Sequence, residues 1–219
     1  YVMNTAVGML LLTVLTILFA VSGKGVLSSL LEMNVSTSDL MPIFCAICTL
    51  MCGMTCTTGV SISLEGKTLW ILRSQPVRET DIFRAKISLN LLVTLPLLTL
   101  NVAALGVLLS LNPLEFFILW AVPAVYSVFT ALFGLFVNLL LPKMEWNSAM
   151  VVIKQSASSF ASVFGGMLAV IAVALVYLFL LPRMDFLLFG GIVAAVFALI
   201  DLVLWARLRS WGVKKLRTL

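Results

Sequence analysis

Residues 114–141 read LEFFILWAVPAVYSVFTALFGLFVNLLL, an apolar run in which Glu115 is the single charged residue. About 20 apolar residues are enough for a helix to cross the hydrocarbon core of a bilayer. The whole chain has the same character, with 62% hydrophobic and 11% charged residues. A soluble domain carries about 25% charged residues. The sequence therefore predicts an all-α integral membrane protein.

Hydropathy predicts five further spans around this one. They are Val2–Val21, Leu40–Val60, Ile87–Leu111, Ser156–Leu181 and Phe186–Ala206. With Leu114–Leu141 they predict a polytopic fold, in which residues 1–219 form a single six-span transmembrane domain. A loop of residues 61–87 separates spans two and three, and residues 207–219 form a basic tail. The chain begins with Tyr1 rather than Met, so we expect it to be a fragment.

Basic residues concentrate in alternate connections between the spans. Twelve of the 14 Lys and Arg residues lie in three segments, which are residues 61–87, 142–155 and 207–219. The opposite connections hold only Lys24 and Arg183. Because basic residues favour the cytoplasmic side, the bias places these three segments and both termini in the cytoplasm. The net charge of +5 then reflects loops that face anionic lipid rather than a nucleic-acid partner.

The loop of residues 61–87, here called the charged loop, is long for a connection between spans. Pro76 divides it into two helix-forming pieces, of which the second starts near Arg78 and runs into span three. One interpretation is an amphipathic helix at the membrane surface, anchored by Trp70 at the depth of the lipid headgroups. The other is a helix presented to a cytosolic partner. Both can hold together, since Trp70 can anchor the loop while residues 75–81 project from it.

Residues 65–68 read EGKT and resemble the end of a phosphate-binding loop. That motif requires its first glycine at position 61, where this chain has Ser61. It also requires a preceding β-strand, and a membrane span precedes these residues. The sequence therefore argues against nucleotide binding by this chain.

Four cysteines follow one another in span two at helical spacing, namely Cys45, Cys48, Cys52 and Cys56. A helix would place all four thiols on one face. One interpretation is a path for a thiophilic metal ion such as Cu(I). The other, which we favour, is packing, because cysteine is a small apolar residue that is frequently buried. We therefore expect no metal site.

Asp201 is an acidic residue well inside a predicted span. Such carboxylates are candidates for proton coupling. Its position six residues before Arg207 favours a structural role near the cytoplasmic interface instead. The chain has no His, and no grouping of residues fits a catalytic site. We therefore expect a protein that is not an enzyme.

Two stretches of this sequence carry a family pattern. The first reads Glu65-Gly66-Lys67-x-x-Trp70-x-Leu72-Arg73-Ser74-x-Pro76, followed by Ile82-x-x-Ala85-Lys86. The second reads Asn138-Leu139-x-x-Pro142-Lys143-Met144-Glu145-Trp146-Asn147, followed by Val152-Ile153-Lys154-Gln155-Ser156. The first resembles the first cytoplasmic loop of type-two ABC transporter permeases, particularly the bacterial exporters. The second resembles the loop between spans four and five of the same proteins.

The resemblance implies a permease subunit of an ATP-driven exporter in the bacterial cytoplasmic membrane, working by alternating access. It implies two partners, an ABC ATPase subunit and a second six-span permease unit, with ATP and magnesium bound by the ATPase and no cofactor in this chain. The charged loop would hold the coupling helix, which docks in a groove of the ATPase. The docking residues would be Gln75, Pro76, Val77, Arg78, Glu79, Thr80 and Asp81, supported by Glu65, Lys67, Trp70, Arg73 and Lys86.

This chain departs from the family pattern in two respects. The family more often has Ser or Thr at the position of Arg78, where the second helix starts. Permeases of this group are often about twice as long, so we expect the chain to be one half of a longer protein. Two other functions stay open: a membrane scaffold or immunity protein whose cytoplasmic loop recruits a partner, and a thiol-based metal transporter or membrane enzyme.

Overall fold

A computed structural model describes residues 6–32, 37–180 and 184–219, and within these ranges the chain is helical and contains no strand. The sequence therefore predicts the all-α class correctly. The α-helices are α2 (Val7–Glu32), α3 (Thr37–Met54), α4 (Leu69–Ser74), α5 (Glu79–Leu108), α6 (Pro113–Leu140), α7 (Ala149–Gln155), α8 (Ala157–Leu180), α9 (Phe186–Arg207) and α10 (Val213–Thr218). Short helical turns lie at η1 (Thr58–Val60), η2 (Gly66–Thr68) and η3 (Leu208–Gly212).

Five helical segments of the described chain have the length and composition to cross a membrane. They are Leu40–Val60, Glu79–Leu108, Pro113–Leu140, Ala149–Phe179 and Phe186–Thr218. A shorter apolar segment, Val7–Ser22, lies in α2. The multi-span helical architecture is thus confirmed. The sixth span stays a prediction, because its expected start at residue 2 lies outside the described residues.

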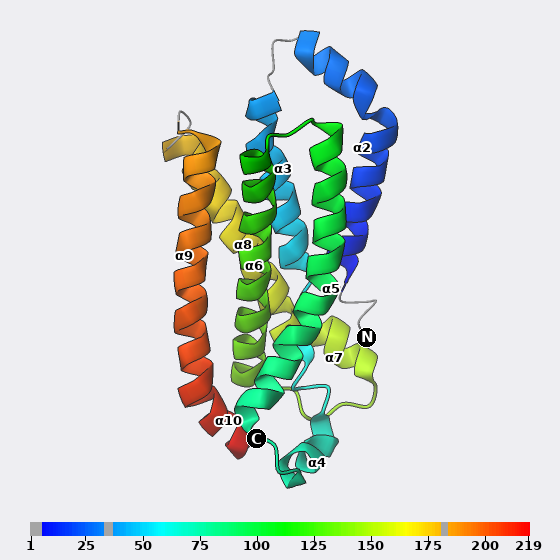
Figure 1. Cartoon of the computed structure of the whole chain (residues 1–219). Coiled ribbons are helices and arrows are strands. Elements are labelled where there is room, and N and C mark those ends of the chain that lie inside the picture. Colours follow the sequence, from blue (N-terminus) through cyan, green and yellow to red (C-terminus); the bar gives the residue numbers. More distant parts are fainter. Residues whose placement is uncertain (1–5, 33–36, 181–183) are drawn as a thin grey trace.

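Helix α6 is the centre of the bundle and packs against α3, α5, α8 and α9 (Figure 1). Its buried side chains point in all directions around the helix, with Leu119, Tyr126 and Leu135 fully enclosed. A helix that is apolar on every side is stable only when other helices surround it. The apolar run of residues 114–141 therefore forms the core around which the other spans assemble.

The α-helix of span two ends before the span itself does. The helix stops at Met54, and residues 55–65 form turns and η1, buried against α6 and α8. Glycine and β-branched residues, which are poor helix formers, occupy most of positions 55–60. The predicted span Leu40–Val60 is found with the same bounds, but its last turns are not α-helix. Non-helical backbone at this depth needs partners inside the protein.

The three basic segments lie at one end of the bundle, where Figure 1 shows α4, α7 and α10 together. Contacts join them, because the Trp146 indole donates a hydrogen bond to the Ser63 carbonyl and Arg217 pairs with Glu79. This arrangement agrees with the grouping derived from the distribution of basic residues. That this end faces the cytoplasm stays a prediction.

Candidate functional site

The exposed tip of the charged loop is a helix, a break and a second helix. Helix α4 ends at Ser74, and Gln75 takes an extended conformation with φ −82° and ψ 147°. The residue before a proline is forced toward this conformation, so Pro76 sets the break. Arg78 is also extended, with φ −72° and ψ 140°, and α5 begins at Glu79. Helices α4 and α5 therefore lie on either side of Pro76, and α5 begins one residue after the predicted start near Arg78. The first piece, expected from about Ser63, is an α-helix only from Leu69.

The residues predicted to dock a partner are open to the surroundings. Residues 75–78 are exposed, and residues 79–81 are half-buried at the start of α5. Trp70 on α4 is 66% exposed and Val77 is 47% exposed, so apolar side chains project beside charged ones. The side chains of Lys67 and Arg73, two predicted supporting residues, lie outside the described residues.

Behind this tip, Asn138 of α6 holds the non-helical segment in place. Its Oδ1 accepts hydrogen bonds from the backbone N–H groups of Ile62 at 2.8 Å and Ser63 at 3.1 Å. Its Nδ2 donates to the hydroxyls of Ser63 at 2.7 Å and Ser158 at 2.9 Å. The side chain is fully buried. An amide offers two donors and two acceptor positions, and all four are used here.

Asn90 of α5 has a similar role near the start of the non-helical segment. Its Oδ1 accepts from the Thr57 backbone N–H at 2.8 Å and from the Thr57 hydroxyl at 2.9 Å. The neighbouring Thr58 hydroxyl donates to the Ala131 carbonyl at 2.7 Å. These bonds supply partners that the interrupted helix no longer offers, as buried backbone requires.

The two sequence stretches that carry the family resemblance contact each other in the structure. Trp146 donates its indole N–H to the Ser63 carbonyl at 2.8 Å, and the Lys143 backbone N–H donates to the Ser63 hydroxyl at 3.0 Å. Gly66 has φ +47°, and a Cβ on it would lie 2.8 Å from the Trp146 indole nitrogen. Only glycine meets both conditions without strain. We call Thr57, Ser63, Asn90, Asn138 and Trp146 the polar junction.

An ion pair ties the charged loop to α5. The Lys86 ammonium donates to Glu65 Oε1 at 2.7 Å and to the Ser61 carbonyl at 2.9 Å. Both partners are largely shielded, with 14% of the Lys86 side chain and 30% of the Glu65 side chain exposed. The structure therefore brings together two of the predicted supporting residues. Trp70, by contrast, is exposed.

A second ion pair joins the docking residues to the tail. Arg217 of α10 donates to Glu79 Oε1 at 2.5 Å. Leu216, the neighbouring residue, is buried in an apolar cluster that contains Phe83. The tail is therefore packed against the start of α5, a contact that no sequence pattern indicated.

Sequence reasoning missed the buried members of the polar junction. Asn138 stands within one of the two family stretches but was assigned no role, Asn90 was not singled out, and Ser63 was considered only as a possible N-cap of the first helical piece. The available signal was an amide side chain inside an apolar span, since such a group must find partners in lipid. The partners themselves lie 75 and 76 positions away in the chain.

The four cysteines are buried, free thiols. Cys45, Cys48 and Cys52 lie on α3 in the main apolar core, while Cys56 follows the end of that helix. The Cys56 thiol donates to the Thr130 carbonyl at 3.5 Å. The prediction that one helical face carries all four thiols is therefore wrong for Cys56. Among the described residues, no three potential metal ligands lie close enough to share an ion.

Asp201 of α9 is buried, with 8% of its surface exposed. Its Oδ1 has no hydrogen-bond partner within the described part of the chain. The structural role near the interface that the sequence favoured for this residue stays a prediction.

Comparison with known proteins adds no relative, because no family model, curated protein or solved structure matches this chain.

Proposed function

We propose that this chain is the permease subunit of an ATP-driven ABC exporter and that residues 75–81 dock into its ATPase subunit. The observation that carries the proposal is the exposed helix–break–helix at one end of a bundle of apolar helices. Its side chains make up a mixed apolar and charged surface, which is the character of an interface core with a polar rim.

The polar junction supports a role in transmitting force. A push on α4 reaches Glu65 and Ser63 through continuous backbone, and from there Asn138 on α6 and Ser158 on α8. Lys86 carries the same displacement into α5. The docking surface is thus connected by buried hydrogen bonds to three helices of the bundle.

Transport by alternating access requires two states of the bundle with different affinities for the ATPase, since equal affinity shifts no equilibrium. In the proposed cycle, ATP and magnesium bind to the partner ATPase, and its closure draws together the docking surfaces of this chain and a second six-span unit. The connection from residues 75–81 to α6 then converts that movement into reorientation of the spans. This chain itself carries out no hydrolysis.

The test reverses one charge on the docking surface. Arg78 is exposed, and its side chain makes no capping hydrogen bond to α5. The helix should therefore tolerate the substitution Arg78→Glu. We expect the variant to fold. Much less ATPase subunit should copurify with it, and in membranes it should stimulate much less ATP hydrolysis than the parent chain. Glu145→Lys is the matched control, because Glu145 is exposed in the second loop at the same end.

If Arg78→Glu retains both the ATPase subunit and coupled hydrolysis, these residues do not dock it. If purification instead recovers a cytosolic partner without nucleotide-binding activity, the chain is a membrane scaffold rather than a permease.

A further inference from the structure

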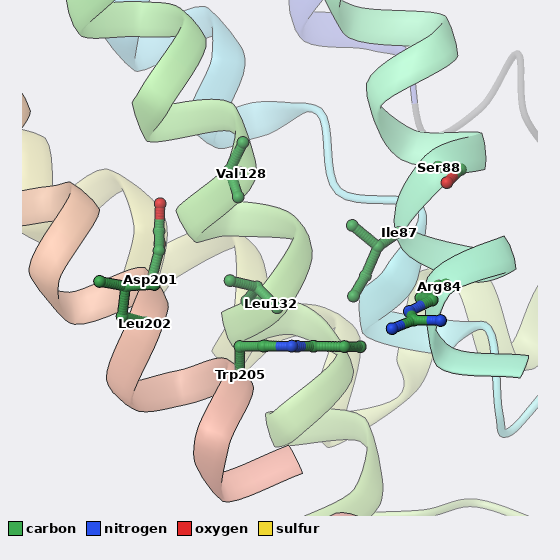
Figure 2. Close-up of a pocket in the computed structure, with 8 residues that line it drawn as sticks. All are labelled: Arg84, Ile87, Ser88, Val128, Leu132, Asp201, Leu202 and Trp205. Atoms are coloured by element: carbon green, nitrogen blue, oxygen red, sulfur yellow. The ribbon is translucent and has the colours of Figure 1, made fainter. Parts of the chain in front are cut away.

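An open pocket of about 310 Å³ lies between α5, α6 and α9, near the end that carries α4 and α10. Figure 2 shows the lining residues on three helices: Arg84, Ile87 and Ser88 on α5, Val128 and Leu132 on α6, and Asp201, Leu202 and Trp205 on α9, with the Trp205 ring extending toward Arg84. Most of these side chains are hydrocarbon or aromatic. The volume falls at the small end of the range of ligand pockets, which begins near 300 Å³.

Asp201 makes this pocket unlike an ordinary gap between helices. It lines the pocket and is 92% buried (8% exposed), and no hydrogen bond or ion pair reaches it from the described residues. Burying an ionised carboxylate without a partner costs several kcal/mol or more, depending on its surroundings. A ligand that supplies a positive charge or a hydrogen-bond donor to the Asp201 carboxylate would offset this cost.

Arg84 is not the missing partner of the Asp201 carboxylate. It lines the same pocket, but its guanidinium donates to Asp81 at 3.1 Å and lies 5.8 Å from the centre of the Trp205 ring. Trp205 stands one helical turn from Asp201 on α9, and Arg84 is held over the Trp205 ring rather than at the Asp201 carboxylate. The positive charge that lines this pocket is thus already engaged.

We propose that this pocket binds an apolar molecule that carries one ammonium group. The ammonium pairs with the Asp201 carboxylate, and the hydrocarbon part packs against Ile87, Val128 and Leu202. An ammonium supplies both the positive charge and up to three hydrogen-bond donors. Charge-assisted bonds of this kind are about twice as strong as neutral ones.

The chemistry of the pocket argues against the other ligand classes. An anion would meet the Asp201 charge, and a neutral hydrocarbon would leave that carboxylate unpaired. A divalent cation needs several oxygen or nitrogen ligands, and the described residues form no such cluster. The site goes beyond the proposed transport function, because binding needs neither an ATPase nor a second permease unit.

The experiment measures binding to the purified chain in phosphatidylcholine nanodiscs, with empty nanodiscs subtracted. The probes are n-octylamine, n-octanol and octanoate, which share a chain length and differ in charge. We expect octylamine to bind most tightly. Asp201→Asn should weaken octylamine binding about tenfold or more, since the buried charge pair is lost, and should leave octanol binding unchanged.

Glu145→Gln is the matched control, because it removes a negative charge from an exposed position outside the pocket. It should bind octylamine like the parent chain. Val128→Phe keeps the carboxylate but fills the cavity, and it should weaken octylamine and octanol alike. This second variant carries the test if Asp201→Asn does not fold.

Three results would overturn the proposal: equal affinity of the parent chain for octylamine and octanol, full octylamine binding by a folded Asp201→Asn, or full binding by Val128→Phe. A chain that binds octylamine as expected but recruits no ATPase would contradict the transport proposal alone.

Discussion

Asn138 holds the non-helical segment in place through the hydrogen bonds of a single side chain. It satisfies the N–H groups of Ile62 and Ser63 and fixes two serine hydroxyls, on opposite sides of the same amide. A buried polar group that loses its partner costs about 1–3 kcal/mol. Several groups depend on this amide at once, so its removal is more damaging than the loss of one hydrogen bond.

We therefore expect Asn138→Leu to lower the free energy of unfolding by about 3 kcal/mol or more. Asn138→Asp keeps the two acceptor contacts to Ile62 and Ser63, but it loses both donors and places a carboxylate at a fully buried position, so it should destabilise the chain by a comparable amount. Denaturation of the purified protein in detergent measures both. Asn147→Ala, at an exposed position of the following loop, is the control and should change stability little. Equal stability of Asn138→Leu and Asn147→Ala would show that the polar junction does not hold the segment.

At the scale of elements, hydropathy predicts the ends of a helix well where the helix coincides with an apolar run of the sequence. The predicted spans Leu114–Leu141 and Phe186–Ala206 differ from α6 and α9 by at most one residue at each end. Residues 55–65 were harder, because their conformation depends on amides of α5 and α6 that no local pattern reveals. Local composition shows a weak helix there, whereas the partners that replace the helical bonds come from tertiary structure.

The ion pair between Glu65 and Lys86 is the contact that fastens the charged loop to α5, and a double-mutant cycle can measure it. We expect Glu65→Gln and Lys86→Met to couple by about 1 kcal/mol, since the pair is largely shielded and also engages the Ser61 carbonyl. The pair between Asp81 and Arg84 is the comparison. Its side chains are 46% and 64% exposed, so a cycle there should give about 0.5 kcal/mol or less. Equal coupling energies in the two cycles would mean that shielding adds nothing to the loop contact.

At the scale of the whole molecule, the distribution of Lys and Arg predicts more of the tertiary arrangement than the distribution of apolar residues does. The pattern of Lys and Arg groups three segments that are far apart in the sequence, and the structure places them together (Figure 1). Nothing in the sequence indicated that α6 would be the central helix or that α10 would pack against the start of α5. Those arrangements depend on which apolar faces fit together, and nearly every span offers apolar faces.

The grouping of the three basic segments at one end of the bundle predicts which introduced cysteines a membrane-impermeant maleimide labels from each side of the membrane. The native cysteines are each 6% exposed or less, so the parent chain should stay unlabelled and serve as the background. Cysteines placed at the exposed positions Gln75, Asn147 and Lys214 should all react in inside-out vesicles. Leu114, 58% exposed at the opposite end of the bundle, should react as Leu114→Cys only in vesicles of the other orientation.

The reason is geometric, since α5 alone separates residue 75 from residue 114, and α6 returns the chain to residue 147. Labelling of Gln75→Cys and Leu114→Cys from the same side would mean that α5 does not cross the membrane. Labelling of Gln75→Cys, Asn147→Cys and Lys214→Cys from the outer face would reverse the orientation derived from the basic residues. In that case no cytosolic ATPase could reach residues 75–81, and the proposed coupling would fail with the topology.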